Sequence, residues 1–457
     1  MQKGVLDTAL GLLTERTLCD SCLGRQFALL GSELENKERG RAIKTALVLQ
    51  GNLLMDGPKK NEGRQILEIL AINGMFRPAM ASLAKSGIEV DEKQNECFIC
   101  ETTMSQIKEI AEKTVQKLGE YEFNTFLIGS KFPARFIERE DQLRSRFNII
   151  WGESIKSEMN REIGKTVLKT LKKMKKEVNF TNPEIVVELI ISDAQNVDVS
   201  VRVNPVFLYG RYRKLLRGIP QTTWLCRECR GRGCDNCGGT GRMYETSVEE
   251  LIAKPLLEIT GGESTKFHGA GREDIDAVML GSGRPFVIEI KEVKKRFFPL
   301  EYLEKKINEF SRGKVDVHGV RWGSKEDARK IKAFSRISRK TYKAVVELEE
   351  DVTEEYTKRI EKELTDATIS QRTPNRVAHR RADKIRLKKI FNIEVHRLEK
   401  RMIELVIQCQ GGLYVKELID GDGGRTTPNI SDILGVRAEC KSLDVIDVES
   451  ISEYESG

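Results

Sequence analysis

The sequence predicts an α+β protein of two or three domains, and three observations support this prediction. Strand-like runs occur in both halves of the chain, at residues 185–191, 197–203, 285–290, 342–349 and 402–408. Helical segments separate these runs irregularly, which favours a mixed or antiparallel sheet over a doubly wound one. The 457 residues are enough for each domain to bury its own core.

The first half is expected to contain helices followed by a β-hairpin. Residues 105–118 carry apolar side chains three and four positions apart, and residues 165–178 repeat this spacing with a basic outer face. Valine alternates with polar residues from 197 to 203, soon after the apolar run 185–191. Such runs on either side of the short segment 193–196 predict two antiparallel strands.

A segment rich in arginine and aromatic residues follows at 206–224, with Arg211 and Tyr212 near its centre. Guanidinium groups among aromatic rings suit stacking on RNA bases with simultaneous phosphate contact. Packing of the rings in a core is the alternative. We treat Arg211 and Tyr212 as candidate substrate-binding residues.

A cysteine- and glycine-rich stretch at 226–242 has too few apolar side chains to form a core and indicates a domain junction. We therefore expect an N-terminal domain over residues 1–225, a linker over 226–242 and a C-terminal domain over 243–457. Helices expected at 299–312 and 353–367 separate the strands of the last domain.

The net charge of +7 is modest for this length, but its distribution favours a phosphate-rich partner. Residues 371–391 hold eight arginines and lysines against one acid, and a second basic cluster follows the strand-like run 285–290. Either cluster alone is equally well explained as a solvated face. Two such clusters downstream of a candidate active site together favour a phosphate-rich partner.

No run of 18 or more apolar residues and no secretory signal pattern is found in the sequence, so we expect a cytosolic protein without membrane contact. Thiols stay reduced in that compartment, so the ten cysteines are not expected to form disulfides. Eight of them form C-x-x-C pairs.

These pairs predict two zinc sites, because two C-x-x-C knuckles complete a tetrahedron of four thiolates. The first set joins distant segments and consists of Cys19, Cys22, Cys97 and Cys100. The second set lies within one short segment and consists of Cys226, Cys229, Cys234 and Cys237. Four thiolates leave no open position for water, which indicates a structural role. The second set is similar to the cysteine repeats of J-protein chaperones, and redox-active thiols stay open as an alternative there.

The stretch GAGREDIDAV, residues 269–278, places an arginine and three acids between a pair of glycines and a strand-like run. A solvated loop would have the same composition. A carboxylate on a loop upstream of two basic clusters is also a candidate general base or nucleophile.

Four segments in combination closely resemble the Pus-ten type of tRNA pseudouridine synthase in its archaeal form, at residues 267–290, 18–28, 210–224 and 369–381. The resemblance covers essentially the whole chain. It implies a pseudouridine synthase sheet domain in the C-terminal half and a THUMP-type RNA-binding region in the zinc-binding, α/β N-terminal half. It also implies isomerisation of uridine to pseudouridine at positions 54 and 55 in the TΨC arm of tRNA, without an organic cofactor. We expect the enzyme to be a monomer.

The resemblance also implies roles for the loop residues. Arg272-Glu273-Asp274 matches the Arg-x-Asp element of the family, so Asp274 is the expected catalytic carboxylate. Arg272 matches the arginine that fills or holds the space left by the flipped base. Glu273 would point to the opposite side of an extended loop, and Asp276 is expected to be a turn or strand-entry residue.

Further site residues follow from the same resemblance. Tyr342 matches the tyrosine that stacks on the flipped base, with an ordinary strand aromatic as the alternative. Val415 would pack below the base, and Lys416 would pair with Asp274, unless it is only a surface cation. The expected phosphate contacts in the basic run are Arg376, Arg380 and Arg381.

Two other functions fit parts of the sequence. Another THUMP-bearing tRNA modifier, such as a methyltransferase or a thiolation enzyme, would need a glycine-rich nucleotide loop, and neither G-x-G-x-x-G nor G-x4-G-K-[ST] occurs. A zinc-stabilised RNA-binding or RNA-chaperone protein without catalysis would leave the combination of Asp274, Tyr342 and Lys416 unexplained.

Overall fold

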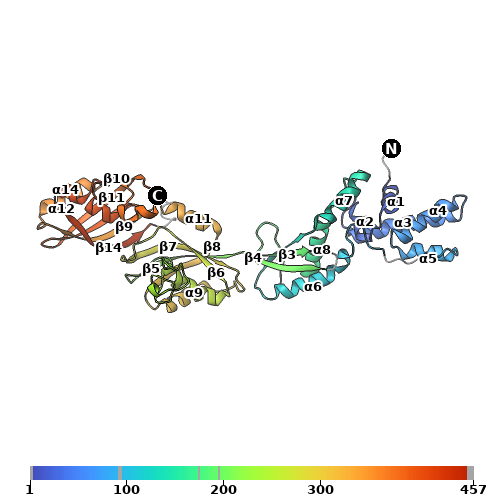
Figure 1. Cartoon of the computed structure of the whole chain (residues 1–457), viewed down its shortest axis with the longest axis horizontal. Helices are drawn as coiled ribbons and strands as arrows, with labels where there is room; N and C mark the ends of the chain where they lie inside the picture. Colours follow the sequence, from blue (N-terminus) through green and yellow to red (C-terminus); the bar gives the residue numbers. More distant parts are fainter. Residues whose placement is uncertain (1–3, 91–94, 173–174, 194–195, 450–457) are drawn as a thin grey trace. The chain divides into compact units, whose positions relative to one another are not determined.

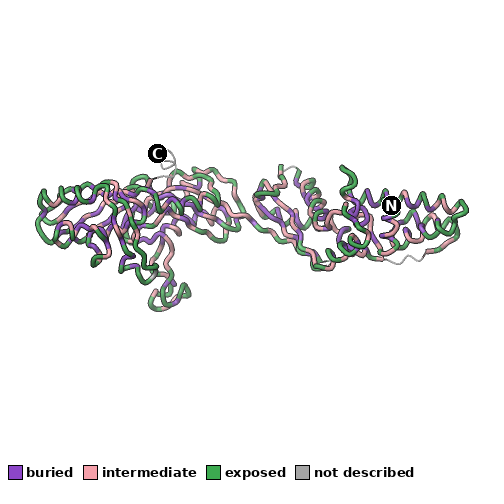
Figure 2. The backbone as a smooth tube through the Cα atoms, turned by 90° about the horizontal axis from the view of Figure 1, so that it is seen from above, coloured by how far each residue is buried: buried purple, intermediate pink, exposed green. Residues whose placement is uncertain are grey.

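The computed structural model describes residues 4–90, 95–172, 175–193 and 196–449, and the chain divides into two compact units. Unit 1 is Met1–Asn204 and unit 2 is Pro205–Gly457. In each unit the buried residues gather between its own helices and strands (Figure 2). Among the described residues, no helix is long and apolar enough to cross a membrane.

Unit 1 begins with a group of helices and continues with three helices beside a small sheet (Figure 1). The helices are α1 (Val5–Glu15), α2 (Asp20–Arg25), α3 (Asn36–Met55), α4 (Lys60–Ile72), α5 (Arg77–Lys85), α6 (Ile107–Leu118), α7 (Ala134–Phe147) and α8 (Ile155–Thr170). Helix α6 matches the helix expected at 105–118. One continuous apolar cluster runs through all of these elements and forms the core of the unit.

The sheet of unit 1 has four strands in the order β2-β1-β3-β4. They are β1 (Thr125–Lys131), β2 (Glu177–Val178), β3 (Ile185–Ile191) and β4 (Val197–Val203). Strand β1 runs parallel to both of its neighbours, whereas β3 and β4 pair antiparallel as expected. The expected turn at 193–196 lies partly outside the described residues.

The helix expected at 165–178 is only partly correct. Helix α8 ends at Thr170, and Glu177 and Val178 instead form β2 by pairing with Thr125 and Phe126 of β1. Residues 173 and 174, which belong to the same expected helix, lie outside the described residues. Sheet pairing therefore overrides the helical spacing at the end of this segment.

Unit 2 is built on one ten-stranded sheet in the order β13-β10-β11-β12-β9-β14-β7-β5-β8, with β6 also paired to β7 (Figure 1). The strands are β5 (Val206–Lys214), β6 (Ser264–Gly269), β7 (Met279–Lys291), β8 (Val315–Gly323), β9 (Arg339–Leu348), β10 (Thr368–Arg372), β11 (Ile385–Glu399), β12 (Met402–Gln410), β13 (Thr426–Thr427) and β14 (Ala438–Val448). Among the described pairings of this sheet, only β14 with β7 is parallel. The expected mixed or antiparallel sheet, rather than a doubly wound one, is confirmed.

The helices of unit 2 lie between these strands in the sequence. They are α9 (Val248–Thr260), α10 (Leu300–Ser311), α11 (Lys325–Phe334), α12 (Glu354–Leu364), α13 (Val415–Asp420) and α14 (Ile430–Leu434). The basic run starts at the end of β10, passes through a short 3₁₀ helix, η4 (Asn375–Arg380), and continues along β11. Most of this run is therefore strand and loop rather than a helical face.

The two units divide at a different place from the expected boundary at residue 225. Strand β5 is hydrogen-bonded to β7 on one side and to β8 on the other, so residues 206–214 belong to the interior of the unit 2 sheet. The division therefore falls after Asn204. The cysteine- and glycine-rich stretch 226–242 lies within unit 2, between β5 and α9.

Helices α2 and α3 approach each other so closely that only glycine fits at two positions. A Cβ atom on Gly24 would overlap the carbonyl oxygen of Asn36, and one on Gly40 would overlap that of Asp20. Both obstacles are backbone atoms of the opposite helix, which cannot rotate away as a side chain can. This contact therefore sets the position of the segment that carries Cys19 and Cys22.

Gly40→Ala is expected to destabilise unit 1 by about 1–3 kcal/mol, the usual cost of overpacking a tight contact. Urea unfolding followed by circular dichroism measures this change. Gly57→Ala is the matched control, because the nearest atoms to its added Cβ lie 3.8 Å away. Equal unfolding midpoints for the two variants would contradict the close approach.

Candidate active site and metal centres

The loop that joins β6 to β7 carries the Arg272-Glu273-Asp274 triplet. Its entry requires glycine, because Gly271 has a φ of +86° and a Cβ there would lie 2.5 Å from the Nζ atom of Lys340. The three side chains point in different directions. Arg272 is exposed, Glu273 is only 4% exposed, and the Asp274 side chain is 36% exposed. Glu273 is thus buried, whereas Arg272 and Asp274 on either side of it reach solvent.

Two cations converge on the carboxylates of this loop. Arg376 of η4 lies 3.4 Å from Asp274, measured from Nη1 to Oδ2. Lys416 of α13 lies 3.7 Å from the same oxygen and 2.8 Å from Oδ2 of Asp276. The expected contact between Lys416 and Asp274 is therefore present, but Lys416 is closer to Asp276, which was expected to be a turn or strand-entry residue.

The charges in this cluster shift one another's protonation. Partial burial acts to raise the pKa of Asp276, but the ammonium of Lys416 outweighs it, so this pKa lies below its ordinary value. Burial acts to lower the pKa of Lys416, and the carboxylates of Asp276 and Asp274 outweigh it in turn. Both groups are therefore charged at neutral pH.

Arg376 was expected to contact phosphate, but the structure engages it with carboxylates. Its Nε atom lies 2.5 Å from Oε1 of Glu417, whose side chain is almost completely buried. Because Glu417 follows Lys416 on α13, both cations that face Asp274 are tied to the same short helix. Arg376 therefore orients the carboxylates of Asp274 and Glu417 in this structure.

Tyr342 and Val415 lie in the core that borders this cluster. Tyr342 is half-buried on β9, where it pairs with Ile407 of β12 and Val445 of β14. Burial raises the pKa of the Tyr342 hydroxyl, and the negative charge of Asp274 adds to this rise. The hydroxyl is thus protonated and able to donate. Val415 begins α13 and is 3% exposed.

An open cavity of about 330 Å³ lies beside the loop. Its lining residues are Arg272, Arg381, Ala382 and Arg386. The guanidinium of Arg272 lies 5.0 Å from the centre of the Trp224 ring, and Arg386 donates a hydrogen bond to the Thr373 hydroxyl at 2.9 Å. Three guanidinium groups around one cavity suit a phosphate anion. The side chain of Arg380 lies outside the described part of the chain.

The prediction that Arg211 and Tyr212 bind substrate is corrected by their placement. Tyr212 is completely buried and packs against Phe267 and Phe286, so its ring cannot stack on a base. Arg211 lies on the other face of β5 and donates hydrogen bonds to Ser282 and to the carbonyl oxygens of Gly283 and Val448. Alternation along an interior strand explains both positions.

Several polar residues beneath the loop were missed from the sequence. Lys214 is completely buried, and it occurs in phase with the buried positions of β5, which is a signal that the sequence contains. Arg284 is 1% exposed and pairs in register with Tyr212. Gln221 and Lys340 are also buried. Only the strand register brings these residues together, so no local motif marks them.

The eight paired cysteines form two clusters, as their spacing predicts. In each cluster the four sulfur atoms lie within 4.8 Å of one another. The nearest sulfurs are 3.7 Å apart in the first cluster and 3.7–3.8 Å apart in the second. Zinc–sulfur bonds of about 2.3 Å in a tetrahedron put the sulfurs about 3.8 Å apart. The thiol sets therefore fit a tetrahedral metal ion.

Backbone N–H groups point at these sulfurs, as expected for thiolates. In the first cluster the N–H of Cys22 donates to Cys19 at 3.4 Å. In the second, the N–H groups of Gly233 and Gly241 donate to Cys229 and Cys237 at 3.2 and 3.1 Å. These glycines have positive φ, which allows the turns that aim the amides.

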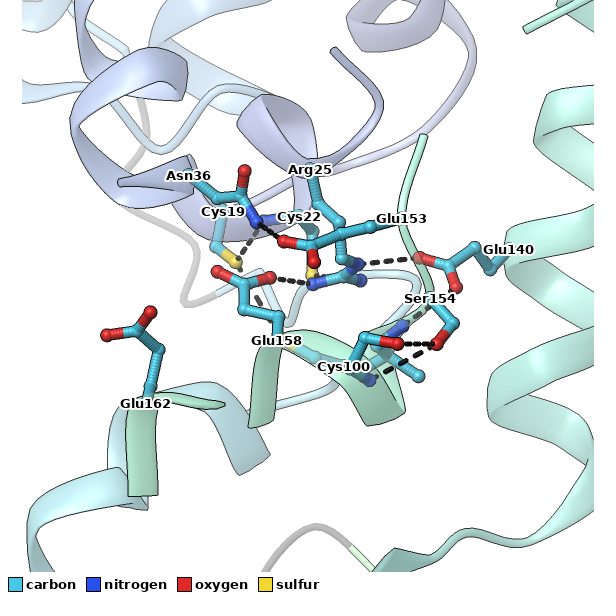
Figure 3. Close-up of polar contacts among 12 residues, drawn as sticks. Cys19, Cys22, Arg25, Asn36, Cys100, Glu140, Glu153, Ser154, Glu158 and Glu162 are labelled. Atoms are coloured by element: carbon cyan, nitrogen blue, oxygen red, sulfur yellow. Dashed lines mark hydrogen bonds and ion pairs between the residues drawn. The ribbon is translucent and has the colours of Figure 1, made fainter. Parts of the chain in front are cut away.

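A buried arginine joins the first cluster to the rest of unit 1. Arg25 is completely buried, and its guanidinium contacts the sulfur of Cys22 at 3.3 Å, Glu140 of α7 at 2.7 Å and Glu158 of α8 at 2.7 Å (Figure 3). Glu140 also accepts from the N–H of Ile155 at the start of α8. The cluster is thus linked through one cation to both helices.

Comparison with known proteins identifies the family. The family described as "Pus10, C-terminal" matches residues 207–449, and the archaeal Pus10 THUMP domain matches residues 110–189. A curated relative from Methanothrix thermoacetophila, named tRNA pseudouridine synthase Pus10, is 41% identical over 98% of this chain and 95% of its own length. A relative of the same name from Thermofilum pendens is 40% identical over 96% of this chain and 94% of its own length. Another, from Methanocaldococcus jannaschii, is 41% identical over 98% of this chain and 95% of its own length.

The chain therefore has the domain content of a pseudouridine synthase with a THUMP domain. It belongs to the Pus10 family of tRNA pseudouridine synthases. The α+β fold class and the THUMP domain in the first half, both expected from the sequence, are confirmed.

Lys340 is the lysine near the site whose pKa lies far below its ordinary value. Its Nζ atom lies 3.4 Å from the carbonyl oxygen of Ala270. Burial, and next the charge of Arg284, lower the pKa of Lys340 to about 7; Lys388 also lowers it, whereas Cys409 and Glu273 oppose the shift. An unfolded lysine titrates at about 10.4. The penalty for burying this amine is therefore full below about pH 7 and disappears as the pH rises through about 10.

Lys340→Met is expected to raise the free energy of unfolding by a few kcal/mol at pH 6.5, with a much smaller gain at pH 10. Urea unfolding at both pH values measures the difference from the wild type. Lys343→Met, at a half-exposed position on the same strand, is the control and should change little at either pH. An equal gain at both pH values for Lys340→Met would contradict the lowered pKa.

Proposed function

We propose that this chain isomerises uridine to pseudouridine at positions 54 and 55 in the TΨC arm of tRNA, with Asp274 as the catalytic carboxylate. Membership of the Pus10 family supports the reaction class. One structural observation carries the assignment to Asp274. Asp274 is the half-exposed carboxylate of the family's Arg-x-Asp element, and Arg376 and Lys416 face it. An arginine-lined cavity lies beside the same loop.

The reaction breaks the bond between N1 of uracil and C1′ of ribose and forms a bond from C5 to C1′. The proton on C5 is released and N1 gains one, so the step is an isomerisation and needs no oxidant. Asp274 acts either as a nucleophile on the sugar or as a base that takes a sugar proton. Both roles use the charged carboxylate. Arg376 and Lys416 attract its negative charge.

The target uridine must leave its stack to reach this carboxylate, at a cost of a few kcal/mol. In the proposal Arg272, which is exposed beside the half-buried Trp224, holds the space that the base leaves. Tyr342 stacks on the flipped base and Val415 packs below it. Arg381, and with it Arg380 of the same basic run, contacts the RNA backbone, together with the THUMP-containing unit 1. Binding that depends on phosphate contacts weakens steeply with salt.

Asp274→Asn is expected to lower the rate of tritium release from tRNA labelled at C5 of uridine by ~10²–10⁴-fold. The substitution keeps the size of the side chain and removes its charge. Affinity for tRNA, measured by filter binding, should stay within about threefold of wild type, because no phosphate contact is lost.

Asp276→Asn is the matched control, since it removes the neighbouring carboxylate that contacts the same lysine. We expect its rate to stay within about tenfold of wild type. Comparable losses in the two variants would reject Asp274 as the catalytic residue. Wild type that binds tRNA but releases no tritium would reject the reaction and favour a non-enzymatic RNA-binding role.

We further propose that each cysteine cluster holds one structural zinc ion. Zinc would stabilise unit 1 by joining Cys19 and Cys22 to Cys97 and Cys100, which lie far apart in the sequence. The N–H donors around each cluster stabilise thiolate charge. Four sulfur ligands leave no position for a reacting water, so catalysis stays with Asp274.

Metal analysis of the purified protein by mass spectrometry is expected to find two zinc ions per chain. Cys97→Ser and Cys229→Ser should each lose one zinc, because each removes a ligand from a different cluster. Cys440→Ser is the control and should keep both, since Cys440 belongs to neither cluster. Fewer than one zinc per wild-type chain would contradict the proposal.

A further inference from the structure

The residue between the motif arginine and the catalytic carboxylate is buried and charged. Glu273 is 4% exposed, whereas the neighbours on both sides of it, Arg272 and Asp274, reach solvent. Glu273 therefore offers almost no surface to a base in the site. A buried carboxylate is costly unless it is paired and hydrogen-bonded, which raises the question of what compensates it.

Two side chains of the sheet, Arg284 and Tyr212, compensate Glu273 directly, and Gln221 supports Tyr212. Oε2 of Glu273 lies 2.9 Å from Nε of Arg284, which is itself 1% exposed. The hydroxyl of Tyr212 donates to the same carboxylate at 2.9–3.0 Å. Gln221 in turn donates from Nε2 to the Tyr212 hydroxyl at 2.8 Å. We call Glu273, Arg284, Tyr212 and Gln221 the anchor network.

The anchor network also binds the backbone of the loop. Arg284 donates to the carbonyl oxygen of Ala270 at 2.8 Å, and Gln221 donates to that of Gly271 at 2.9 Å. Lys214, a buried neighbour from the same strand as Tyr212, donates to the carbonyl oxygens of Asp274 and Ile275, each at 3.1 Å. Buried side chains therefore hold the loop backbone on both sides of the Glu273 residue.

These contacts determine where the catalytic carboxylate lies. Glu273 is bonded directly to Asp274 in the chain, so contacts that hold its side chain beneath the loop also fix the backbone from which Asp274 reaches solvent. An apolar residue at this position could neither compensate Arg284 nor accept from Tyr212, and removing one partner of a buried ion pair is strongly destabilising. The network thus selects one backbone conformation for the triplet.

We propose that Glu273 is a positioning residue for catalysis, which acts through Arg284 and Tyr212 to hold Asp274 where it faces Arg376 and Lys416. The proposal rests on the proposed function of Asp274. Loss of the anchor network lowers the chemical rate, because a displacement of about 1 Å in an active site costs about 10²-fold. It leaves tRNA affinity unchanged, because the anchor residues are buried and do not reach the RNA.

Two variants test this role at different strengths. Glu273→Gln keeps the shape of the side chain but removes the charge that compensates Arg284. Tyr212→Phe removes only one hydroxyl and keeps the ring contacts with Phe267 and Phe286, so it folds even if Glu273→Gln does not. Tyr209→Phe is the matched control, because it removes a hydroxyl from the same strand outside the anchor network.

Two measurements on the full-length, zinc-loaded protein decide the proposal. The first is the single-turnover rate of tritium release at saturating enzyme, together with the tRNA Kd. We expect the rate to fall ~100-fold in Glu273→Gln and ~10-fold in Tyr212→Phe, with Kd within about twofold of wild type and Tyr209→Phe unchanged. The second is amide hydrogen exchange of the peptide covering 270–278, which should be faster in both anchor variants and unchanged in Tyr209→Phe.

Faster exchange in the loop combined with a rate loss at constant Kd supports the positioning role. Any other combination in Tyr212→Phe overturns it, including a rate loss matched by an equal loss of tRNA affinity. A wild type that releases no tritium rejects the proposed function instead. In that case the exchange measurement, which needs no catalysis, decides alone whether the anchor network holds the loop.

Discussion

The buried ion pair between Glu273 and Arg284 is the interaction on which the candidate active site depends. It places two opposite charges in the interior of unit 2, each almost without solvent contact. Such a pair contributes less to stability than to the choice of one structure, because either charge alone would be costly. Here the chosen structure is the loop in which Arg272 and Asp274 reach solvent. Arg376 of η4 and Lys416 of α13 contact Asp274 there.

In unit 1, a buried arginine likewise pairs with buried carboxylates, beside the first cysteine cluster. The guanidinium of Arg25 lies between a cluster sulfur and two buried glutamates, and so links α2 to α7 and α8 (Figure 3). A metal ion bound by the four thiolates would therefore support the helices of the THUMP region as well as the segment that holds it. In both units a buried arginine joins a chemically important segment to the surrounding core.

Much of the fold was predictable because its signals are local. Strict alternation predicted β4, and the spacing of the C-x-x-C pairs predicted both cysteine clusters. Contacts between residues far apart in the sequence decide the rest of the fold and of the site. Tyr212 was a candidate for stacking on a base because arginines surround it in the sequence, with core packing as the alternative, and strands on both sides bury it. Arg284 could not be found either, since only the register of β5 with β7 places it opposite Tyr212. The contact of Lys416 with Asp276 depends on the placement of α13, which no local pattern specifies.

The most direct test of the account is to map pseudouridine at nucleotide resolution in a tRNA transcript incubated with the purified wild-type protein. Carbodiimide labelling followed by primer extension reports each modified position. The account predicts new stops that correspond to positions 54 and 55 and to no other uridine of the transcript. A transcript that is bound by the protein but remains unmodified at both positions would contradict it.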